Sequence, residues 1–440
     1  MSTAAHRRPS AALRASPGRH DRATSGRAAA HALALAFLAA DWRRPALLAA
    51  GFETLGRRPR WMGPLVTRVL GAYRVAPADR PRELAGFLEA QLPAFLPNRI
   101  AVRRAVPTRV VRLRWDTPPI DDLAALAEFL GVDGDRLDWF ADRREINRKT
   151  AVDPLRHYRY QWRPHRLIEA PKPRLRALQR TLLDDLLGRV PVHPAAHGFV
   201  PGRSAFTFAA PHAGRPVVVR LDLAAFFTSI SISRVYGLFR AMGYPEPVAH
   251  TLAALCTTAT PADVLRGHPG GFVLRAPHLP QGAPTSPAIA NLCTYRLDRR
   301  LAAAADAFAA VYTRYADDLA FSGDLTRGAA RRLVRLVERI AAAEGFRINP
   351  AKTRIRGQGD RQLLAGLVVN ERPAAPREEY DRLRAILHAA ARDGLAAANR
   401  DGHPDFAAHL AGRIEWVGRG RPARAAKLRE LYTAAVATQL

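Results

Sequence analysis

The chain has 440 residues, with 68 Lys or Arg against 39 Asp or Glu, which gives a formal net charge of +29. This length allows one multi-lobed unit or two to three domains, and so large a positive excess indicates a polyanionic partner, most simply nucleic acid. The most apolar stretch, residues 28–51, is interrupted by Asp41, Arg43 and Arg44, so the sequence predicts no membrane-spanning segment and no membrane partner.

The two cysteines, Cys256 and Cys293, form neither a CxxC pair nor a zinc spacing. Both lie in apolar surroundings, which is typical of small core residues. A chain with no disulfide framework suits a reducing compartment. We therefore predict a cytoplasmic protein.

The first 150 residues divide into two parts by composition. Residues 1–27 are rich in Arg, Ala, Ser and Pro, with no apolar core before a cleavage site, and are predicted to be a disordered basic tail. Residues 28–150 are predicted to be an N-terminal helical extension. Within it, residues 120–130 place apolar side chains at helical spacing, and Gly131 ends that helix.

A hairpin is predicted from residue 158. Tyr158 to Arg163 alternates basic and aromatic residues, a strand pattern that suits a surface in contact with nucleic acid. Residues 166–171 are expected to be its partner strand, and residues 175–187 an amphipathic helix.

The central part of the chain alternates predicted strands and helices. Residues 216–223 form a β-branched run typical of a buried strand, with Asp222 near its end. Further elements are expected in this order: helices over 233–242 and 247–256, a loop over 279–287, a helix over 288–301, strands over 310–314 and 319–322, a helix over 328–344, an apolar segment over 363–370, and helices after residue 376.

The tetrapeptide Tyr315-Ala316-Asp317-Asp318 stands between the two short strands of that region. Adjacent aspartates at the tip of a hairpin repel each other, and a tight turn normally favours Gly or Asn. A divalent cation would remove this penalty. The alternative is a solvated turn whose aspartates cap the following backbone.

Asp222 supplies a third carboxylate from a separate strand. If that strand lies beside the hairpin, three carboxylates converge at one edge of a sheet, a hard oxygen set that suits Mg²⁺. Two such ions about 4 Å apart activate an attacking hydroxyl and stabilise a leaving oxygen, which is the chemistry of nucleic-acid extension. Taken alone, Asp222 could instead be a helix cap.

These motifs carry a resemblance to a known family. Four segments resemble, in order, the sequence blocks of bacterial reverse transcriptases: residues 220–227, 279–287, 314–322 and 345–353. Residues 196–204 and 364–370 are similar to the retron branch of that family. The resemblance implies an α+β right-hand polymerase with fingers and palm over residues 151–375, an antiparallel palm sheet with helices on one face, and a helical thumb over residues 376–440.

The resemblance also implies roles for individual residues. Asp222, Asp317 and Asp318 would be the catalytic carboxylates and would bind two Mg²⁺ ions, with Mn²⁺ as an alternative. Phe227 would be a steric gate against the ribonucleotide 2′-OH, whereas Phe226 is expected in the core.

The other implied contacts are to nucleotide and primer. Nucleotide-binding positions would be Arg166 at the triphosphate, Gln281 and Gly282 in the pocket, and Lys352 near the leaving pyrophosphate. Tyr315 would lie beside the primer end. On the C-terminal lobe, Arg413 and Trp416 would contact template and primer. The alternatives are a core aromatic for Phe227, a lone surface lysine for Lys352 and an aromatic that packs on the sheet for Tyr315.

The implied partners are an RNA template, a DNA or RNA primer, dNTPs, a cognate structured non-coding RNA copied into retron-like DNA, and an effector protein in antiviral defence. Residues 208–212 depart from the retron Asn-Ala-x-x-His element by losing its Asn, and Leu364-Ala365-Gly366 replaces Val-Thr-Gly. The alternatives are another defence-associated bacterial reverse transcriptase with protein-primed or untemplated synthesis, an RNA polymerase of the same palm fold, and a non-catalytic RNA-binding protein.

Overall fold

The computed structural model describes residues 23–24, 26–77, 81–92, 100–101, 113–143, 145–164, 166–268 and 271–437. The chain divides into two compact units, residues 1–111 and 112–440. Most of the predicted basic tail, residues 1–22, lies outside the described residues. None of the described helices is both long enough and apolar enough to cross a membrane.

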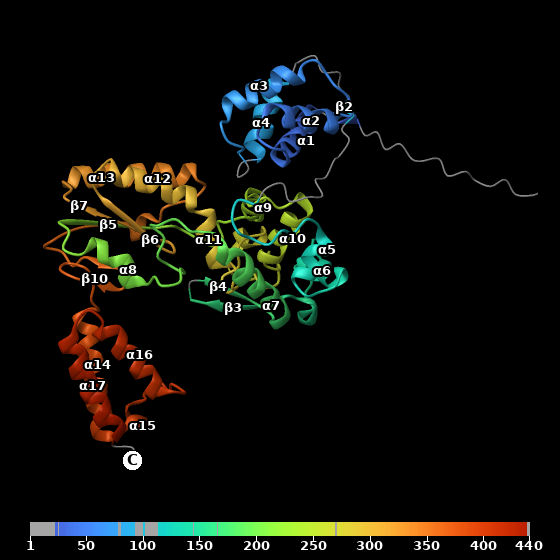
Figure 1. The fold of residues 1–440 in the computed structure, drawn as a ribbon. Helices are drawn as coiled ribbons and strands as arrows, with labels where there is room; N and C mark the ends of the chain where they lie inside the picture. Colours follow the sequence, from blue (N-terminus) through green and yellow to red (C-terminus); the bar gives the residue numbers. More distant parts are fainter. Residues whose placement is uncertain are drawn as a thin grey trace, which may run out of the picture. The chain divides into compact units, whose positions relative to one another are not determined.

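The first unit is a small helical module (Figure 1). Apolar residues recur at helical spacing along its first helix, and Ala30, Leu33 and Phe37 are buried there. They pack with Met62 and Leu88 in one closed apolar cluster. Its elements are β1 (Ala23–Thr24), α1 (Gly26–Ala39), α2 (Arg44–Leu55), α3 (Met62–Ala72), α4 (Pro81–Gln91) and β2 (Ile100–Ala101), with β1 and β2 paired antiparallel.

The second unit begins with two short helices, α5 (Leu123–Phe129) and α6 (Gly134–Ala141). Both contact α10 (Glu246–Cys256), which places them in the second unit. Asp122 and Asp133 cap them by accepting hydrogen bonds from Ala125 N and Arg136 N. The segment predicted as one helical extension, residues 28–150, is therefore divided between the two units.

A four-stranded antiparallel sheet lies at the centre of the second unit, in the order β6-β7-β5-β8. Its strands are β5 (Val217–Asp222), β6 (Val311–Tyr315), β7 (Asp318–Gly323) and β8 (Arg354–Gly357). The register pairs Asp222 with Asp318 and Val219 with Phe321. Because directly paired residues project from the same face of a sheet, Asp222 and Asp318 share one face.

The two faces of this sheet are covered differently. On one face, Tyr312 donates a hydrogen bond to Asp298 of α12 (Tyr295–Asp306), and α13 (Arg327–Ala343) lies beside α12 (Figure 1). On the other face, Val218 and Ala320 pack against α8 (Ala205–Ala209) and the hairpin of β9 (Leu363–Leu364) and β10 (Leu367–Val368). The antiparallel sheets and surrounding helices confirm the predicted α+β class.

The predicted basic and aromatic hairpin is confirmed, with β3 (Tyr158–Arg163) paired to β4 (Arg166–Pro171). Glu169 N of β4 donates to Gln281 O across 2.8 Å, which ties the hairpin to the loop before α11 (Ser286–Cys293). The helix expected over 175–187 is instead α7 (Pro173–Thr181), followed by a π turn over Leu182–Leu186 and a 3₁₀ turn over Leu187–Arg189. The remaining helix of this region is α9 (Ile232–Ala241), and further 3₁₀ turns span Asp153–Leu155, Ala210–His212, Gly271–Arg275 and Pro350–Lys352.

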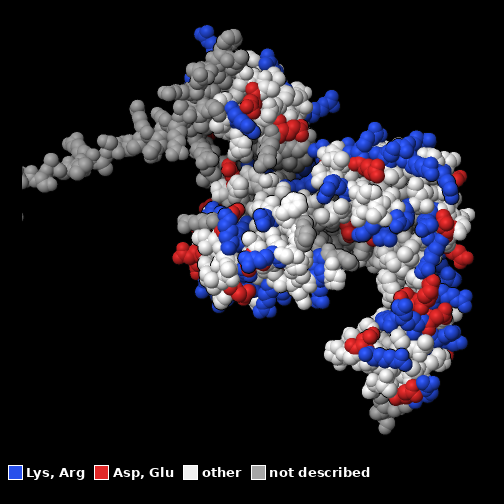
Figure 2. Space-filling model, turned by 180° about the vertical axis from the view of Figure 1, so that it is seen from behind, with Lys and Arg blue, Asp and Glu red and all other residues white. Residues whose placement is uncertain are grey.

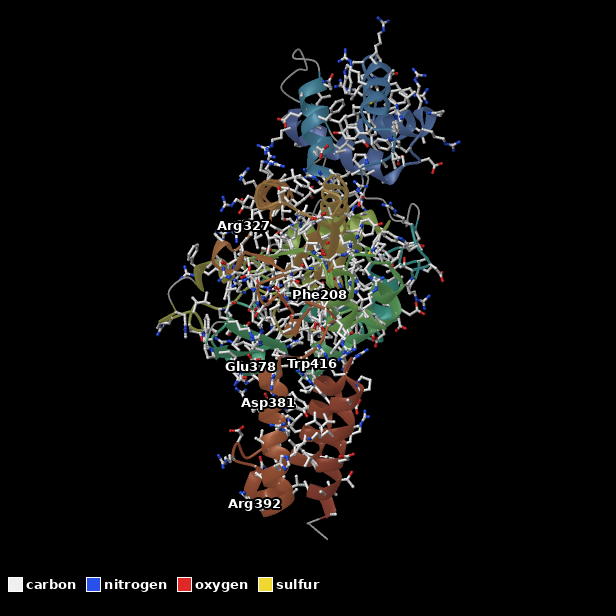
Figure 3. The ribbon with its side chains drawn as sticks, turned by 90° about the vertical axis from the view of Figure 1, so that its left-hand side faces the viewer. Phe208, Arg327, Glu378, Asp381, Arg392 and Trp416 are labelled. Atoms are coloured by element: carbon white, nitrogen blue, oxygen red, sulfur yellow. The ribbon has the colours of Figure 1, made fainter. Side chains whose placement is uncertain are left out.

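The C-terminal residues form a helical bundle with its own core, in which Leu383, Leu387, Leu410, Ile414 and Leu428 are buried. The bundle consists of α14 (Arg377–Asp393), α15 (Leu395–Ala398), α16 (Phe406–Gly418) and α17 (Pro422–Ala437). In Figure 3, Glu378, Asp381 and Arg392 follow α14 along the bundle, and Trp416 lies at its opposite end from Arg392.

Candidate active site

The predicted hairpin with aspartates at its tip is confirmed. Tyr315 and Asp318 are the last pair of β6 and β7, so Ala316 and Asp317 form the turn. Ala316 has a φ of 54°, a left-handed value that is uncommon outside glycine. Leu223 N donates to Asp317 O across 2.9 Å, which joins the turn to the end of β5.

Two features beneath the turn hold this strained conformation. Gly198 passes so close that an added Cβ would lie 2.6 Å from Ala316 N, so a side chain is excluded there. Arg314, fully buried, donates to both carboxylate oxygens of Asp298 at 2.7 Å, to Asn291 Oδ1 at 3.0 Å and to Ala316 O at 3.1 Å. The guanidinium therefore anchors the turn backbone to α11 and α12.

Asp222 ends β5 directly opposite Asp318 and is 3% exposed. Lys352 Nζ lies 2.7 Å from Asp222 Oδ2, and the backbone of Asn349 donates to Asp222 O across 2.8 Å. The structure thus brings Asp222, the aspartate turn and Lys352 to one edge of the sheet, as the spacing of the motifs predicts.

The carboxylate of Asp318 pairs with an arginine side chain. Arg220, two residues before Asp222 on the same strand face, donates from Nε and Nη2 to Asp318 Oδ1 at 2.9 and 2.7 Å. Sequence reasoning did not identify Arg220 as a site residue. The sequence could have indicated this residue, because residues two apart on a strand share a face. A basic residue on the face of Asp222 is expected to neutralise part of the charge of the three carboxylates.

Burial raises the pKa values of Asp317 and Asp318. Burial, followed by the neighbouring Asp318 and Asp222 charges, raises the pKa of Asp317 to about 6. Burial also raises the pKa of Asp318, against the opposing effect of Arg220. The hydrogen bond to Asp222 raises the pKa of Lys352. The site therefore favours any cation that enters it.

The donor set fits a hard divalent cation, since it consists of three carboxylates and their charges are mutually unfavourable. The side chains are not arranged as a finished cage: the described residues contain no group of three His, Cys, Asp or Glu side chains placed to enclose an ion. Lys352 and Arg220 pair with two of the carboxylates instead.

The other residues expected to contact the nucleotide lie on three segments: the turn after β5, the loop before α11 and the start of β4. Phe227 follows Ala225, which has a φ of 52°, and its ring is 5.4 Å from Phe226 and 6.0 Å from Phe199. Phe227 is partly exposed, whereas Phe226 is buried against Phe346, as expected for a core aromatic.

Gly282 has a φ of 138°, and an added Cβ would lie 2.9 Å from Glu169 O, so the loop can follow β4 this closely only with glycine. The Oε1 atom of the neighbouring Gln281 is buried and accepts no hydrogen bond. Such an atom is costly to bury without a donor. Arg166 begins β4 and is exposed.

A buried pair of side chains, Glu169 and His278, joins β4 to the segment just before the Gln281–Gly282 loop. Glu169 is 1% exposed and accepts hydrogen bonds from Thr260 at 2.7 Å and from His278 at 2.9 Å. Burial opposes the charged imidazole, but the Glu169 hydrogen bond prevails and raises the pKa of His278. Sequence reasoning missed this pair, because its members are distant in the chain and no motif marks them.

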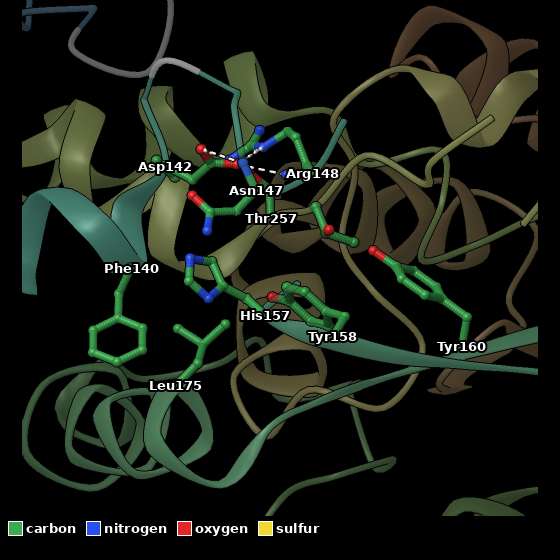
Figure 4. Close-up of a pocket in the computed structure, with 11 residues that line it drawn as sticks. Phe140, Asp142, Asn147, Arg148, His157, Tyr158, Tyr160, Leu175 and Thr257 are labelled. Carbon is green, nitrogen blue, oxygen red and sulfur yellow. Dashed lines mark hydrogen bonds and ion pairs between the residues drawn. The ribbon is translucent and has the colours of Figure 1, made fainter. Parts of the chain in front are cut away.

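A second polar cluster lies beneath the β3–β4 hairpin (Figure 4). Asp142 accepts hydrogen bonds from the backbone of Ile146 and Asn147 and pairs with Arg148 Nε at 3.1 Å. Its cavity has a volume of about 10 Å³, enough for roughly one water and not for a nucleotide. This cluster is therefore a support for the hairpin.

The remaining predicted site residues lie on the hairpin and on the C-terminal bundle. The Tyr315 ring packs 5.7 Å from Phe208 of α8. Trp416 of α16 packs edge-to-face on Phe206 of α8, with 5.1 Å between the ring centroids. Arg413 pairs with Glu379 at 3.3 Å within the bundle.

The groove beside Trp416 has a volume of about 400 Å³ and is lined by Arg419, Arg429 and Glu415 among other residues.

A family model described as reverse transcriptase (RNA-dependent DNA polymerase) matches residues 159–365. The retron Mx65 reverse transcriptase of Myxococcus xanthus is 47% identical to this chain over 267 residues, which cover 60% of each protein. Residues 159–365 thus match a reverse transcriptase domain, and the chain is similar over 60% of its length to a retron reverse transcriptase.

Other retron reverse transcriptases are also similar to this chain in sequence. The retron Mx162 reverse transcriptase of Myxococcus xanthus is 41% identical over 315 residues, 66% of this chain and 63% of the relative. The retron Ec86 reverse transcriptase of Escherichia coli is 33% identical over 224 residues, 51% of this chain and 64% of the relative. The chain thus spans less than two thirds of the length of these relatives, and the retron resemblance predicted from the motifs is confirmed.

The reverse transcriptase domain contains most of the site predictions: Asp222, Asp317, Asp318, Arg166, Phe227, Gln281, Gly282, Tyr315 and Lys352. Arg413 and Trp416 lie in the bundle beyond it. The buried Arg314 is also inside the domain, directly before the tetrapeptide. Its role was not predictable, because its partner Asp298 is 16 residues away in the chain on another element.

Proposed function

We propose that this chain is an RNA-directed DNA polymerase that extends a primer by two-metal nucleotidyl transfer. The observation that carries the proposal is the meeting of Asp222 with the Asp317–Asp318 turn at one sheet edge, inside the matched domain. In this proposal residues 151–375 are fingers and palm, the four-stranded sheet is the palm, and residues 376–440 are the thumb. The protein works in the cytoplasm.

Asp222, Asp317 and Asp318 would hold two Mg²⁺ ions, which Mn²⁺ could replace. Ions bound to these carboxylates would supply activation of the primer hydroxyl and stabilisation of the leaving oxygen. Arg220 orients the Asp318 carboxylate through two hydrogen bonds to one oxygen, which leaves Oδ2 available. Lys352, at 2.7 Å from Asp222, supplies positive charge beside the leaving pyrophosphate.

The incoming dNTP lies between the β3–β4 hairpin and the sheet edge. Arg166 contacts the triphosphate, for which a guanidinium is well suited. Gly282 lets the nucleotide-pocket loop approach β4, and the buried Gln281 Oε1 is a free acceptor in that loop. Phe227 blocks a 2′-OH and so selects deoxynucleotides.

The template is a cognate structured non-coding RNA, copied from a DNA or RNA primer into retron-like DNA, with an effector protein and antiviral defence as the biological setting. Tyr315 contacts the primer end, and Arg413 and Trp416 contact template and primer. The similarity to three retron reverse transcriptases favours this setting over a protein-primed or untemplated enzyme. Sequencing the nucleic acid that copurifies with the chain distinguishes these alternatives.

The test is primer extension on an RNA template with Mg²⁺ and dNTPs. Asp317→Asn should reduce dNTP incorporation to background, because a neutral amide cannot replace a carboxylate ligand, while RNA binding is retained. Asp324→Asn, an exposed aspartate just beyond the same hairpin, is the matched control and should keep full activity. Full synthesis by the Asp317→Asn chain would contradict the proposal.

A further inference from the structure

One face of α13 carries an unusual concentration of positive charge. Five arginines are exposed there, and Arg327, Arg331, Arg335 and Arg339 follow each other at intervals of four residues, with Arg332 beside them. Residues four apart on a helix are neighbours, so the four form a row about 18 Å long. We call these five residues the arginine ridge.

Figure 2 shows blue side chains gathered along the edge of the main body where α12 and α13 lie.

The repulsion between the arginines of the ridge destabilises α13 when no partner is bound. Like charges at intervals of four residues destabilise a helix, and the ridge contains three such pairs in succession. The first turn of α13 holds Arg327 and no acidic residue, although the positive end of a helix favours carboxylates. Among the exposed positions of this helix, Glu338 is the one acidic residue. An external polyanion would reverse this unfavourable balance.

The exposed arginines of another helix of similar length, α14, are neutralised internally: Arg377, Arg382 and Arg392 pair with Asp381, Glu379 and Asp393. Within the described part of the chain, no hydrogen bond or ion pair is found for the five guanidinium groups of the ridge. The high arginine content of the chain alone does not account for this difference, because it applies equally to α14.

The ridge is separate from the candidate active site. The opposite side of α13 buries Leu333, Val337 and Ile340, so the ridge points away from the body of the second unit. α12 and α13 cover the sheet face that carries Tyr312, whereas Asp222 and Asp318 project from the other face. A polyanion on the ridge is therefore not the template at the carboxylates.

The composition of the face identifies the kind of polyanion. Besides the arginines, its exposed residues are Gly328, Glu338, Ala342 and Ala343. It offers no aromatic platform on which unpaired bases could stack, and no apolar anchor of the kind that protein interfaces need. A row of guanidinium groups without either is suited to the phosphates of a double helix, contacted without reading bases.

We propose that the arginine ridge binds the phosphate backbone of a double-helical region of RNA that lies outside the copied strand. This deepens the proposed function, since it assigns the polymerase a second RNA-binding surface that holds the structured part of its substrate. The ridge sets which RNAs are retained and contributes nothing to the addition of a nucleotide.

The test compares two triple variants of the full chain. The ridge variant carries Arg327→Gln, Arg331→Gln and Arg335→Gln. The control variant carries Arg136→Gln, Arg143→Gln and Lys149→Gln, three exposed residues that pair with Asp133, Asp138 and Glu145. Both lose three positive charges, so a difference between them reflects the ridge and not the net charge.

The probe is a blunt RNA duplex of arbitrary sequence, and the measurement is its binding constant as a function of salt concentration. The ridge variant should bind more weakly, with the slope of log K against log salt smaller by about 2 to 3, as expected for three lost phosphate contacts. The control variant should match the unaltered chain. Equal behaviour of the ridge variant and the unaltered chain, or equal losses in both variants, would overturn the proposal.

Two further readouts separate the causes of failure. Thermal unfolding of the ridge variant should be unchanged or slightly higher in temperature, so weaker binding cannot be assigned to misfolding. Incorporation of dTTP on poly(rA)·oligo(dT) tests the proposed polymerase by itself. If none of the three chains incorporates dTTP, the result counts against the polymerase function and not against the ridge.

A protein partner is the alternative occupant of the ridge. If the ridge variant binds the RNA duplex as the unaltered chain does but no longer copurifies with an acidic protein, the ridge binds that protein and the RNA proposal is overturned.

Discussion

Single residues in this domain show how buried polar groups position the sheet edge that carries the three carboxylates. Arg314 and Asp298 are both fully buried and pair through two hydrogen bonds of 2.7 Å. Removing one partner of such a pair leaves an uncompensated charge, which typically costs about 3–5 kcal/mol. The pair therefore holds the turn that carries Asp317, although neither residue is expected to touch a nucleotide.

His212 is a second buried group, under the other face of the hairpin. Its Nδ1 lies 2.7 Å from Ser322 Oγ, and its Nε2 lies 2.7 Å from Thr313 Oγ1. Because the Thr313 hydroxyl donates to Phe208 O, it accepts from Nε2–H, and Nδ1 accepts from Ser322. Both nitrogens are occupied in the neutral ring, and burial lowers the pKa of His212 to about 3.

This histidine predicts a pH dependence of stability. Between pH 6.5, the ordinary histidine pKa, and about pH 3, this histidine is protonated in the unfolded chain and neutral in the folded chain. The free energy of unfolding therefore falls as pH decreases through this range. The contribution is at most about 1.4 kcal/mol per pH unit. His212→Gln should flatten this part of the profile, measured by urea unfolding between these pH values. An identical slope in both chains would contradict the assignment.

At the scale of elements, strands with strong apolar patterns and turns with acidic residues could be predicted. The strand expected over 216–223 is β5 at 217–222, and the hairpin at 310–322 has its aspartates at the tip. Short elements could not be predicted: β8 has four residues at a sheet edge, and α8 has five. The helix expected over 288–301 is two helices, α11 and α12, that meet at Thr294.

The contact between the Gln281–Gly282 loop and β4 makes a prediction at this scale. Gly282→Ala places a methyl group 2.9 Å from Glu169 O in a backbone conformation that disfavours side chains. The loop must move, at a cost of about 1–3 kcal/mol. Steady-state kinetics should show a raised KM for dNTP together with a lowered unfolding temperature. Gly359→Ala, with open space around it, is the control; equal kinetics for both variants would show that the close approach is dispensable.

At the scale of the whole molecule, the basic residues fall into groups that differ in their ion-pair partners. A net charge of +29 predicted a nucleic-acid partner but not its location. The fold separates this charge into paired arginines on the C-terminal bundle, Arg220 and Lys352 at the carboxylates, and the unpaired ridge on α13. Which charges are free depends on contacts between distant segments, so sequence alone could not separate them.

The central claim is that carboxylates from two separate strand ends form one metal-dependent polymerase site. Asp222 tests it most directly, since it comes from β5 and not from the aspartate turn. The measurement is the rate at which the Asp222→Asn chain adds deoxynucleotides to a primer paired with RNA in the presence of Mg²⁺. We predict a rate at background with template–primer binding retained; a rate equal to that of the unaltered chain would contradict the account.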